Sequence, residues 1–171
     1  MYLARDNRIV GGSLVPAVLI SLALPFAPAK AERMPEPLHF FVGRTELFSL
    51  VKVVMKKPYR SQTVGRGQIL PDGSLSLVQQ VHDQGKPASQ RRWLIREVSP
   101  GRFTGTMSEA VGPVQIQQIG GNFLFKFKMK GKLAVEQWIT PLPGGKAAKS
   151  KVTVKKLGVR VATPEGTIRK L

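Results

Sequence analysis

Apolar and polar residues alternate along much of this chain, with the period of two that is typical of β-strands. In residues 122–132, NFLFKFKMKGK, four apolar side chains alternate with three lysines: Phe123, Phe125, Phe127 and Met129 against Lys126, Lys128 and Lys130. The pattern returns in KVTVK at 151–155. Successive side chains of a strand point to opposite faces. The pattern therefore predicts a sheet with an apolar inner face and a basic, solvated outer face.

Segments of this kind follow one another along the chain, separated by turn signals such as PDG at 71–73 and PLPGGKAAK at 141–149. We count nine or ten of them at a spacing of about ten residues, which is typical of an antiparallel barrel or sandwich. Gly65 and Gly67 suggest a bulge or bend within one strand. Only PLHFF at 37–41 could form a helical turn. We predict an all-β fold, a single antiparallel up-and-down β-barrel of about nine or ten strands.

The phenylalanines and lysines of 122–132 would also suit a nucleic-acid platform. Stacking on bases, however, requires aromatic side chains that face water beside the charges. Here the two sets of side chains lie on opposite faces. We therefore interpret the segment as barrel wall and expect no nucleic-acid partner.

The N-terminal residues have the layout of a secretory signal peptide. Arg5 and Arg8 precede the apolar run 14–24, and Ala29-Lys30-Ala31 closes the segment. This order of basic, apolar and small residues is typical of cleavable signals, and an apolar run of 11 residues is too short for a membrane-spanning helix. We expect a signal peptide at 1–31, cleavage after Ala31, a barrel domain at 32–171 and a periplasmic location.

The net charge of the chain is +17 at pH 7. An exported protein meets anionic lipid headgroups and cell-wall polymers rather than nucleic acid. The charge therefore suggests an anionic membrane or cell-wall surface as a partner, because surface charge bears on partners and solubility rather than on fold. The sequence does not determine the oligomeric state.

From FFVGRTE at 40–46 onwards, the chain resembles a family of uncharacterised bacterial lipocalin-like envelope proteins, many of them lipoproteins. The matching pieces occur in family order: DGSLSLVQQVHDQGK, RRW at 91–93, GRFTGTMSEAVGPV, GGNFLFKFKM, EQW at 136–138 and KKLGVRV. The chain departs from the family in having ELFS after GRT, Glu136-Gln137 in place of an acidic pair, and no lipid-bearing cysteine. The resemblance implies a calycin-type barrel with an internal cavity and implies no reaction.

Residue types that support catalysis or metal binding are scarce. The chain has no cysteine and two histidines, His39 and His82, which are far apart in the sequence. His82-Asp83 lies where a strand runs into a turn, and we interpret it as a solvated pair rather than part of a triad. Two distant histidines do not form a metal cluster. We predict no catalytic residue, no metal and no cofactor, and a protein that is not an enzyme.

A binding function fits the residues better, with a small apolar or amphiphilic ligand, such as a fatty acid or lipid fragment, in the barrel cavity. An inward arginine would bind an anionic head, and phenylalanines would line a slot for the tail. The candidate ligand-binding residues are Arg92, Trp93, Glu109, Phe123, Phe125, Phe127 and Trp138. An alternative is structural, since a tryptophan packed under Arg44 or Arg92 would plug one end of a barrel. A second alternative is a filled barrel that docks through its basic surface on anionic envelope polymers or a partner protein, and a third is an enzyme of unrecognised type.

Overall fold

The computed structural model of the protein describes residues 37–171. The predicted signal peptide at 1–31, and the first residues of the predicted domain at 32–171, lie outside the described residues, so both boundaries stay predictions. One helical turn and ten strands make up the described part: α1 (Pro37–Phe40), β1 (Gly43–Val53), β2 (Tyr59–Ile69), β3 (Leu75–Asp83), β4 (Ser89–Ser99), β5 (Arg102–Met107), β6 (Val114–Ile119), β7 (Asn122–Met129), β8 (Leu133–Pro141), β9 (Ala147–Lys156) and β10 (Val159–Lys170).

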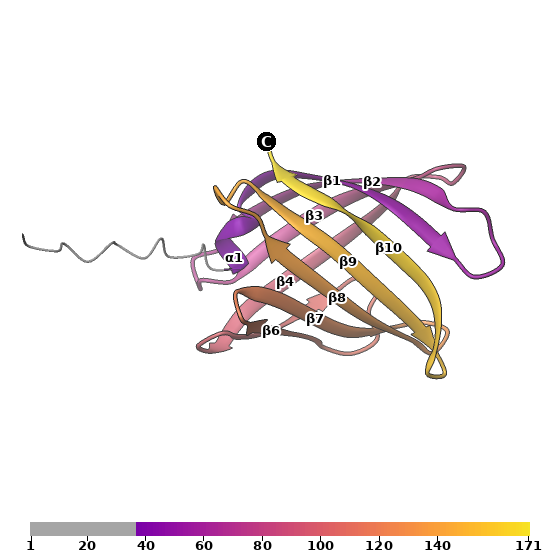
Figure 1. The fold of residues 1–171 in the computed structure, drawn as a ribbon. Helices are drawn as coiled ribbons and strands as arrows, with labels where there is room; N and C mark the ends of the chain where they lie inside the picture. The colour runs from indigo at the N-terminus through magenta and orange to yellow at the C-terminus, as the bar shows by residue number, and fades with distance from the viewer. Residues whose placement is uncertain (1–36) are drawn as a thin grey trace, which may run out of the picture. The chain divides into compact units, whose positions relative to one another are not determined.

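The ten strands form one closed antiparallel barrel in which each strand pairs with its neighbours in the sequence (Figure 1). Strand β1 also pairs with β10 along nine positions, from Thr45–Lys170 to Val53–Ala162. Closure by this pair leaves the sheet without a free edge. The predicted all-β, up-and-down barrel of nine or ten strands is confirmed.

The alternation in β7 separates the inside of the barrel from the outside. Phe123 is 1% exposed and Phe125 is buried, whereas Phe127 and Met129 are half-buried near one end. Lys126 and Lys128 are exposed. The inner face is therefore apolar and the outer face basic, as the pattern predicts.

Helical turn α1 closes one end of the barrel. The rings of Phe40 and Phe41 meet edge to face at 5.1 Å, and Phe41 meets Phe125 of β7 at 6.5 Å. A Cβ on Gly67 would collide with the backbone carbonyl oxygen of Phe41. The bulge predicted at Gly65 and Gly67 is wrong, because β2 pairs in continuous register with β1 and β3. The glycines instead make room, Gly67 for the chain after α1 and Gly65 for the hydroxyl of Thr45.

The up-and-down order gives the barrel two different ends. The strand connections next to α1, which we call the closed end, are 70–74, 100–101, 120–121 and 142–146. The connections at the opposite end, which we call the rim, are 54–58, 84–88, 108–113, 130–132 and 157–158.

Candidate functional site

A cup of about 190 Å³ lies inside the barrel below the rim. Its walls combine apolar and polar side chains from most of the strands. The apolar ones include Val51, Val81, Trp93, Met107 and Phe127, and the polar ones include Ser61, Thr63, Gln79, Asp83, Arg91 and Gln137. A concave site with an apolar lining and a few polar groups is the usual form of a small-molecule site.

A second, smaller cavity of about 40 Å³ lies nearer the closed end, between Phe41, Leu77, Ile95, Phe125 and Ile139. It adjoins the cup, because Leu47, Thr63, Gln79, Trp93 and Gln137 line both spaces. Side chains thus fill most of the closed half of the barrel, and the larger space is in the rim half.

Trp93 lies where the two spaces meet and is fixed on three sides. Its indole Nε1–H donates to Oε1 of Gln79 at 2.8 Å. Its ring also meets those of Phe125 and Phe127 edge to face, at 6.4 and 5.7 Å. A buried tryptophan normally satisfies its N–H in this way. Trp93 therefore forms the floor of the cup and presents a rigid apolar surface to it.

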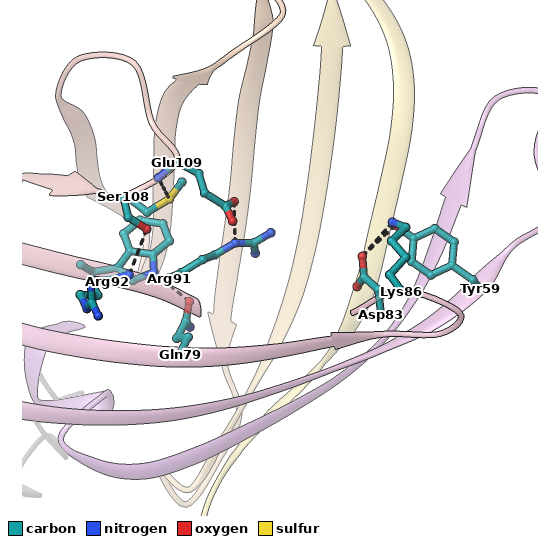
Figure 2. A network of polar contacts seen from close by, with 10 residues as sticks. Tyr59, Gln79, Asp83, Lys86, Arg91, Arg92, Ser108 and Glu109 are labelled. Atoms are coloured by element: carbon teal, nitrogen blue, oxygen red, sulfur yellow. Dashed lines mark hydrogen bonds and ion pairs between the residues drawn. The ribbon is translucent and has the colours of Figure 1, made fainter. Parts of the chain in front are cut away.

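Arg91 is the cationic residue that lines the cup. Its Nε–H donates to Oε2 of Glu109 at 2.8 Å, and both side chains are about one-third exposed. Figure 2 shows the two residues meeting above β4, with the guanidinium reaching out from the strand. The two terminal nitrogens of Arg91 have no hydrogen-bond partner within residues 38–171. They are free to bind a ligand in the cup.

A second polar group lies at the mouth of the cup, at the ends of β2 and β3 (Figure 2). Lys86 donates to the hydroxyl of Tyr59 at 3.1 Å and to Oδ2 of Asp83 at 3.0 Å, and its ammonium lies 4.4 Å from the centre of the Tyr59 ring. Burial acts to raise the pKa of Asp83, but hydrogen bonds from Ser61 and Lys86 outweigh it and hold that pKa below its ordinary value. Asp83 is therefore ionised at neutral pH and neutralises Lys86.

The structure brings some of the predicted ligand-binding residues together and separates others. Trp93 and Phe127 line the cup, and Phe125 lines the smaller cavity. Glu109 does not line the cup itself, but it is hydrogen-bonded to Arg91, which does. Phe123 is packed in the hydrophobic core and lines neither space.

The prediction that Arg92 and Trp138 bind the ligand is wrong, because both residues lie on the outer face. Arg92 is exposed, and its hydrogen bonds with Ser108 come from its backbone: the N–H donates to the Ser108 hydroxyl, and the carbonyl accepts from the Ser108 N–H. Trp138 is 36% exposed and pairs across the sheet with Leu124 and Lys151. Each lies one position away from an inward residue, Arg91 and Gln137 respectively. The proposed plug of tryptophan under Arg44 or Arg92 is likewise not formed, since Trp93 packs on phenylalanines.

Sequence reasoning missed Arg91, Gln79, Asp83 and Tyr59. The alternation of side chains along the strands could have found two of them. Arg91 shares a face of β4 with Trp93 and Ile95, and Gln79 shares a face of β3 with Leu75 and Leu77. Asp83 was interpreted as a solvated turn residue, yet it lines the mouth of the cup, while His82 is exposed on the outer face.

The described residues contain no cluster of three or more histidine, aspartate or glutamate side chains that could hold a metal ion. Among the same residues, no helix is long and apolar enough to cross a membrane.

No model of a known protein family matches the sequence, and no curated protein matches it either. Solved structures do match the fold. The barrel is similar to that of an S-type phycobiliprotein lyase from Guillardia theta, with a TM-score of 0.64 and 8% identity over 78% of this chain and 90% of that chain. It is also similar to a protein with unknown function from the DUF3598 family of Nostoc punctiforme, with a TM-score of 0.59 and 11% identity over 80% of this chain. The match covers 49% of the Nostoc chain, about half its length.

At these identities the likeness shows the fold, a lipocalin-like, calycin-type barrel, as predicted. Membership of the lipocalin-like envelope family is not confirmed, since no family model matches, and it stays a prediction. The prediction that the chain is not an enzyme is contradicted, because a barrel of this architecture belongs to a lyase. A scarcity of familiar catalytic motifs is therefore no ground for excluding catalysis in this fold.

Proposed function

We propose that the barrel binds a small amphiphilic molecule with an anionic head, such as a short fatty acid or a lipid fragment, in the cup below the rim. The observation that carries the proposal is Arg91, a guanidinium that lines a largely apolar cup and has two terminal nitrogens without a protein partner in the described residues.

The head group would bind to the terminal nitrogens of Arg91. A guanidinium has five N–H donors in a planar fork that matches a carboxylate or phosphate. Glu109 accepts one of these donors from Nε, which orients the plane and leaves the outer edge to the ligand. Glu109 is thus a positioning residue for Arg91. A hydrogen bond between charged groups stabilises a complex by about 1.5–3 kcal/mol.

The tail would lie against Trp93, Met107, Phe127, Val81 and Val51, which line the same cup. Each buried methylene contributes about 0.8 kcal/mol, and association and side-chain ordering offset part of that gain. The volume of about 190 Å³ is below the ~300 Å³ at which drug-sized sites begin. We therefore propose a short-tailed or compact ligand rather than a bulky one.

The likeness to a phycobiliprotein lyase supports a role for this barrel in handling a small molecule. The proposal also allows a reaction of the molecule that the cup holds. Export to the periplasm is also part of the proposal, and it rests on the signal-like order of residues 1–31. Edman sequencing of protein from the cell envelope would then begin at Glu32, and a sequence that begins at Met1 would contradict export.

Two adjacent arginines on opposite faces provide the test of the binding site. We expect Arg91→Gln to weaken binding of decanoate about tenfold, which corresponds to about 1.4 kcal/mol. Arg92→Gln removes the same charge from the outer face and should change the affinity less than twofold. Isothermal titration with decanoate measures both variants.

Decanol, which has the same tail without the charge, controls for the head group. Its affinity should be the same for the wild-type protein, Arg91→Gln and Arg92→Gln, because none of its contacts requires the guanidinium. Equal loss of decanoate binding in both arginine variants would show that net charge rather than the cup attracts the ligand, and would overturn the proposal.

A further inference from the structure

The strand connections at the two ends of the barrel differ in charge. The rim connections hold five lysines and one acidic residue, which are Lys56, Lys57, Lys86, Lys130, Lys132 and Glu109. Two of these residues form ion pairs with strand residues, Glu109 with Arg91 and Lys86 with Asp83. The connections of the closed end hold one basic and one acidic residue, Lys146 and Asp72. The basic excess in the connections is therefore confined to the end at which the cup opens.

The same connections expose large apolar side chains beside the lysines. Met55 is 99% exposed and Leu157 is 75% exposed, and Val54 and Val111 are also exposed. Apolar side chains fully in water at the tips of loops are unfavourable in a free protein, and in a group they mark an interaction surface.

Backbone conformation makes the tips more unusual. The non-glycine residues with positive φ in the described chain are Met55, Lys132 and Leu157, at 61°, 59° and 51°. All three lie in rim connections, whereas positive φ at the closed end is found at glycines such as Gly73 and Gly144. Glycine or asparagine would suit these positions with less strain. The rim thus carries large apolar or basic side chains where turn geometry alone favours small ones.

A groove of about 470 Å³ runs beside connection 130–132 and combines both kinds of side chain. Lys128, Lys130 and Lys132 border it, and Val111, Met129, Leu133 and Ala134 give it an apolar lining. An acyl chain beside a phosphate matches this combination of an apolar lining and cationic edges.

We propose that the rim docks on the surface of an anionic lipid bilayer. Its lysines would lie at the level of the lipid phosphates, and Met55 and Leu157 would enter the boundary with the acyl chains. Lysine stems can cover apolar surface while the ammonium stays among the headgroups, and basic residues near an anionic leaflet attract it strongly at low ionic strength. Apart from Met129, which lines both the groove and the cup, the docking surface uses residues other than those that line the cup, so it stands independently of the proposed ligand.

Sedimentation of the full chain with vesicles tests the orientation. The rim variant is Lys56→Gln, Lys57→Gln and Lys130→Gln, and the control with equal charge loss is Lys126→Gln, Lys146→Gln and Lys149→Gln, on the wall and the closed end. With vesicles of phosphatidylcholine and phosphatidylglycerol at low ionic strength, the rim variant should bind about tenfold more weakly than the wild-type protein. The control should stay within about twofold.

Equal losses in the two variants would show attraction by net charge without orientation and would overturn the proposal, as would failure of the wild-type protein to bind these vesicles. The variant Met55→Ser with Leu157→Ser separates a bilayer from a soluble polyanion. It should lose vesicle binding about fivefold or more and keep its affinity for soluble polyglutamate. Unchanged vesicle binding in this double variant would assign the rim to an anionic polymer and overturn membrane docking. Near-ultraviolet circular dichroism, identical among the variants, checks that each is folded.

Discussion

At the scale of single residues, position within a strand decides what each side chain can do. Arg91 and Arg92 are identical in chemistry and adjacent in sequence, yet one lines the cup and the other is exposed on the outer face. Side chains alternate with a period of two, so an error of one position exchanges the inside for the outside. The same error separates Trp138 from the inward Gln137.

The surroundings of Asp83 predict how the free energy of unfolding depends on pH. Its folded-state pKa lies below the ordinary value of 3.8, since its hydrogen bonds outweigh the effect of burial. A group of this kind stabilises the fold when the pH is above its unfolded-state pKa, and that stability is lost as the pH falls through the folded-state pKa. We expect the free energy of unfolding to change little at neutral pH and to fall below about pH 4.

Asp83→Asn should reduce the acid-dependent part of that loss and lower stability at pH 7 by at most about 1 kcal/mol, as is typical of partly exposed ion pairs. Urea unfolding of both proteins at several pH values measures the difference. Parallel curves for the two proteins across the acid range would show that Asp83 does not contribute to the pH dependence.

At the scale of elements, the hydrophobic pattern predicted the strands but not what the glycines do. The alternating segments at 122–132 and 151–155 are found in β7 (Asn122–Met129) and β9 (Ala147–Lys156), and PLHFF supplies the single turn of α1. The pattern cannot show that Gly67 faces the carbonyl of Phe41, because that contact joins two elements far apart in sequence. The register shifts that do occur, at Glu97/Ser99 and Arg160/Ala162, also have no clear signal in the sequence.

Gly67→Ala tests whether the chain directly after α1 packs against β2 at this glycine. The added Cβ would collide with backbone rather than with a flexible side chain, so α1 must move, and overpacking of this kind typically costs 1–3 kcal/mol, here about 2 kcal/mol. The neighbouring Gln68→Ala is on the exposed face and should change stability by less than about 0.5 kcal/mol. Thermal unfolding measures both. A Gly67→Ala variant as stable as Gln68→Ala would show that α1 is not packed against β2 in solution.

At the scale of the whole molecule, the sequence predicted the closed barrel, because every strand repeats the same alternation and period-two patterns survive small errors in strand boundaries. The sequence predicted a cavity inside the barrel but not its position. Its location depends on which connections share an end and on the size of the inward side chains, such as Phe123 and Phe125, which fill the other half. The contrast between a basic, apolar rim and a nearly uncharged set of closed-end connections likewise emerges only once the strands are ordered.

The central claim, that an amphiphile with an anionic head occupies the cup, is tested most directly through Trp93. The chain has two tryptophans, and Trp138 lies on the outer face, so Trp138→Phe leaves the indole at the floor of the cup as the sole tryptophan fluorophore. Titration of this variant with decanoate should give a saturable change in emission, and adding Arg91→Gln should move its midpoint about tenfold higher. Emission that stays constant up to about millimolar decanoate, where binding would contribute only about 4 kcal/mol, would contradict the claim.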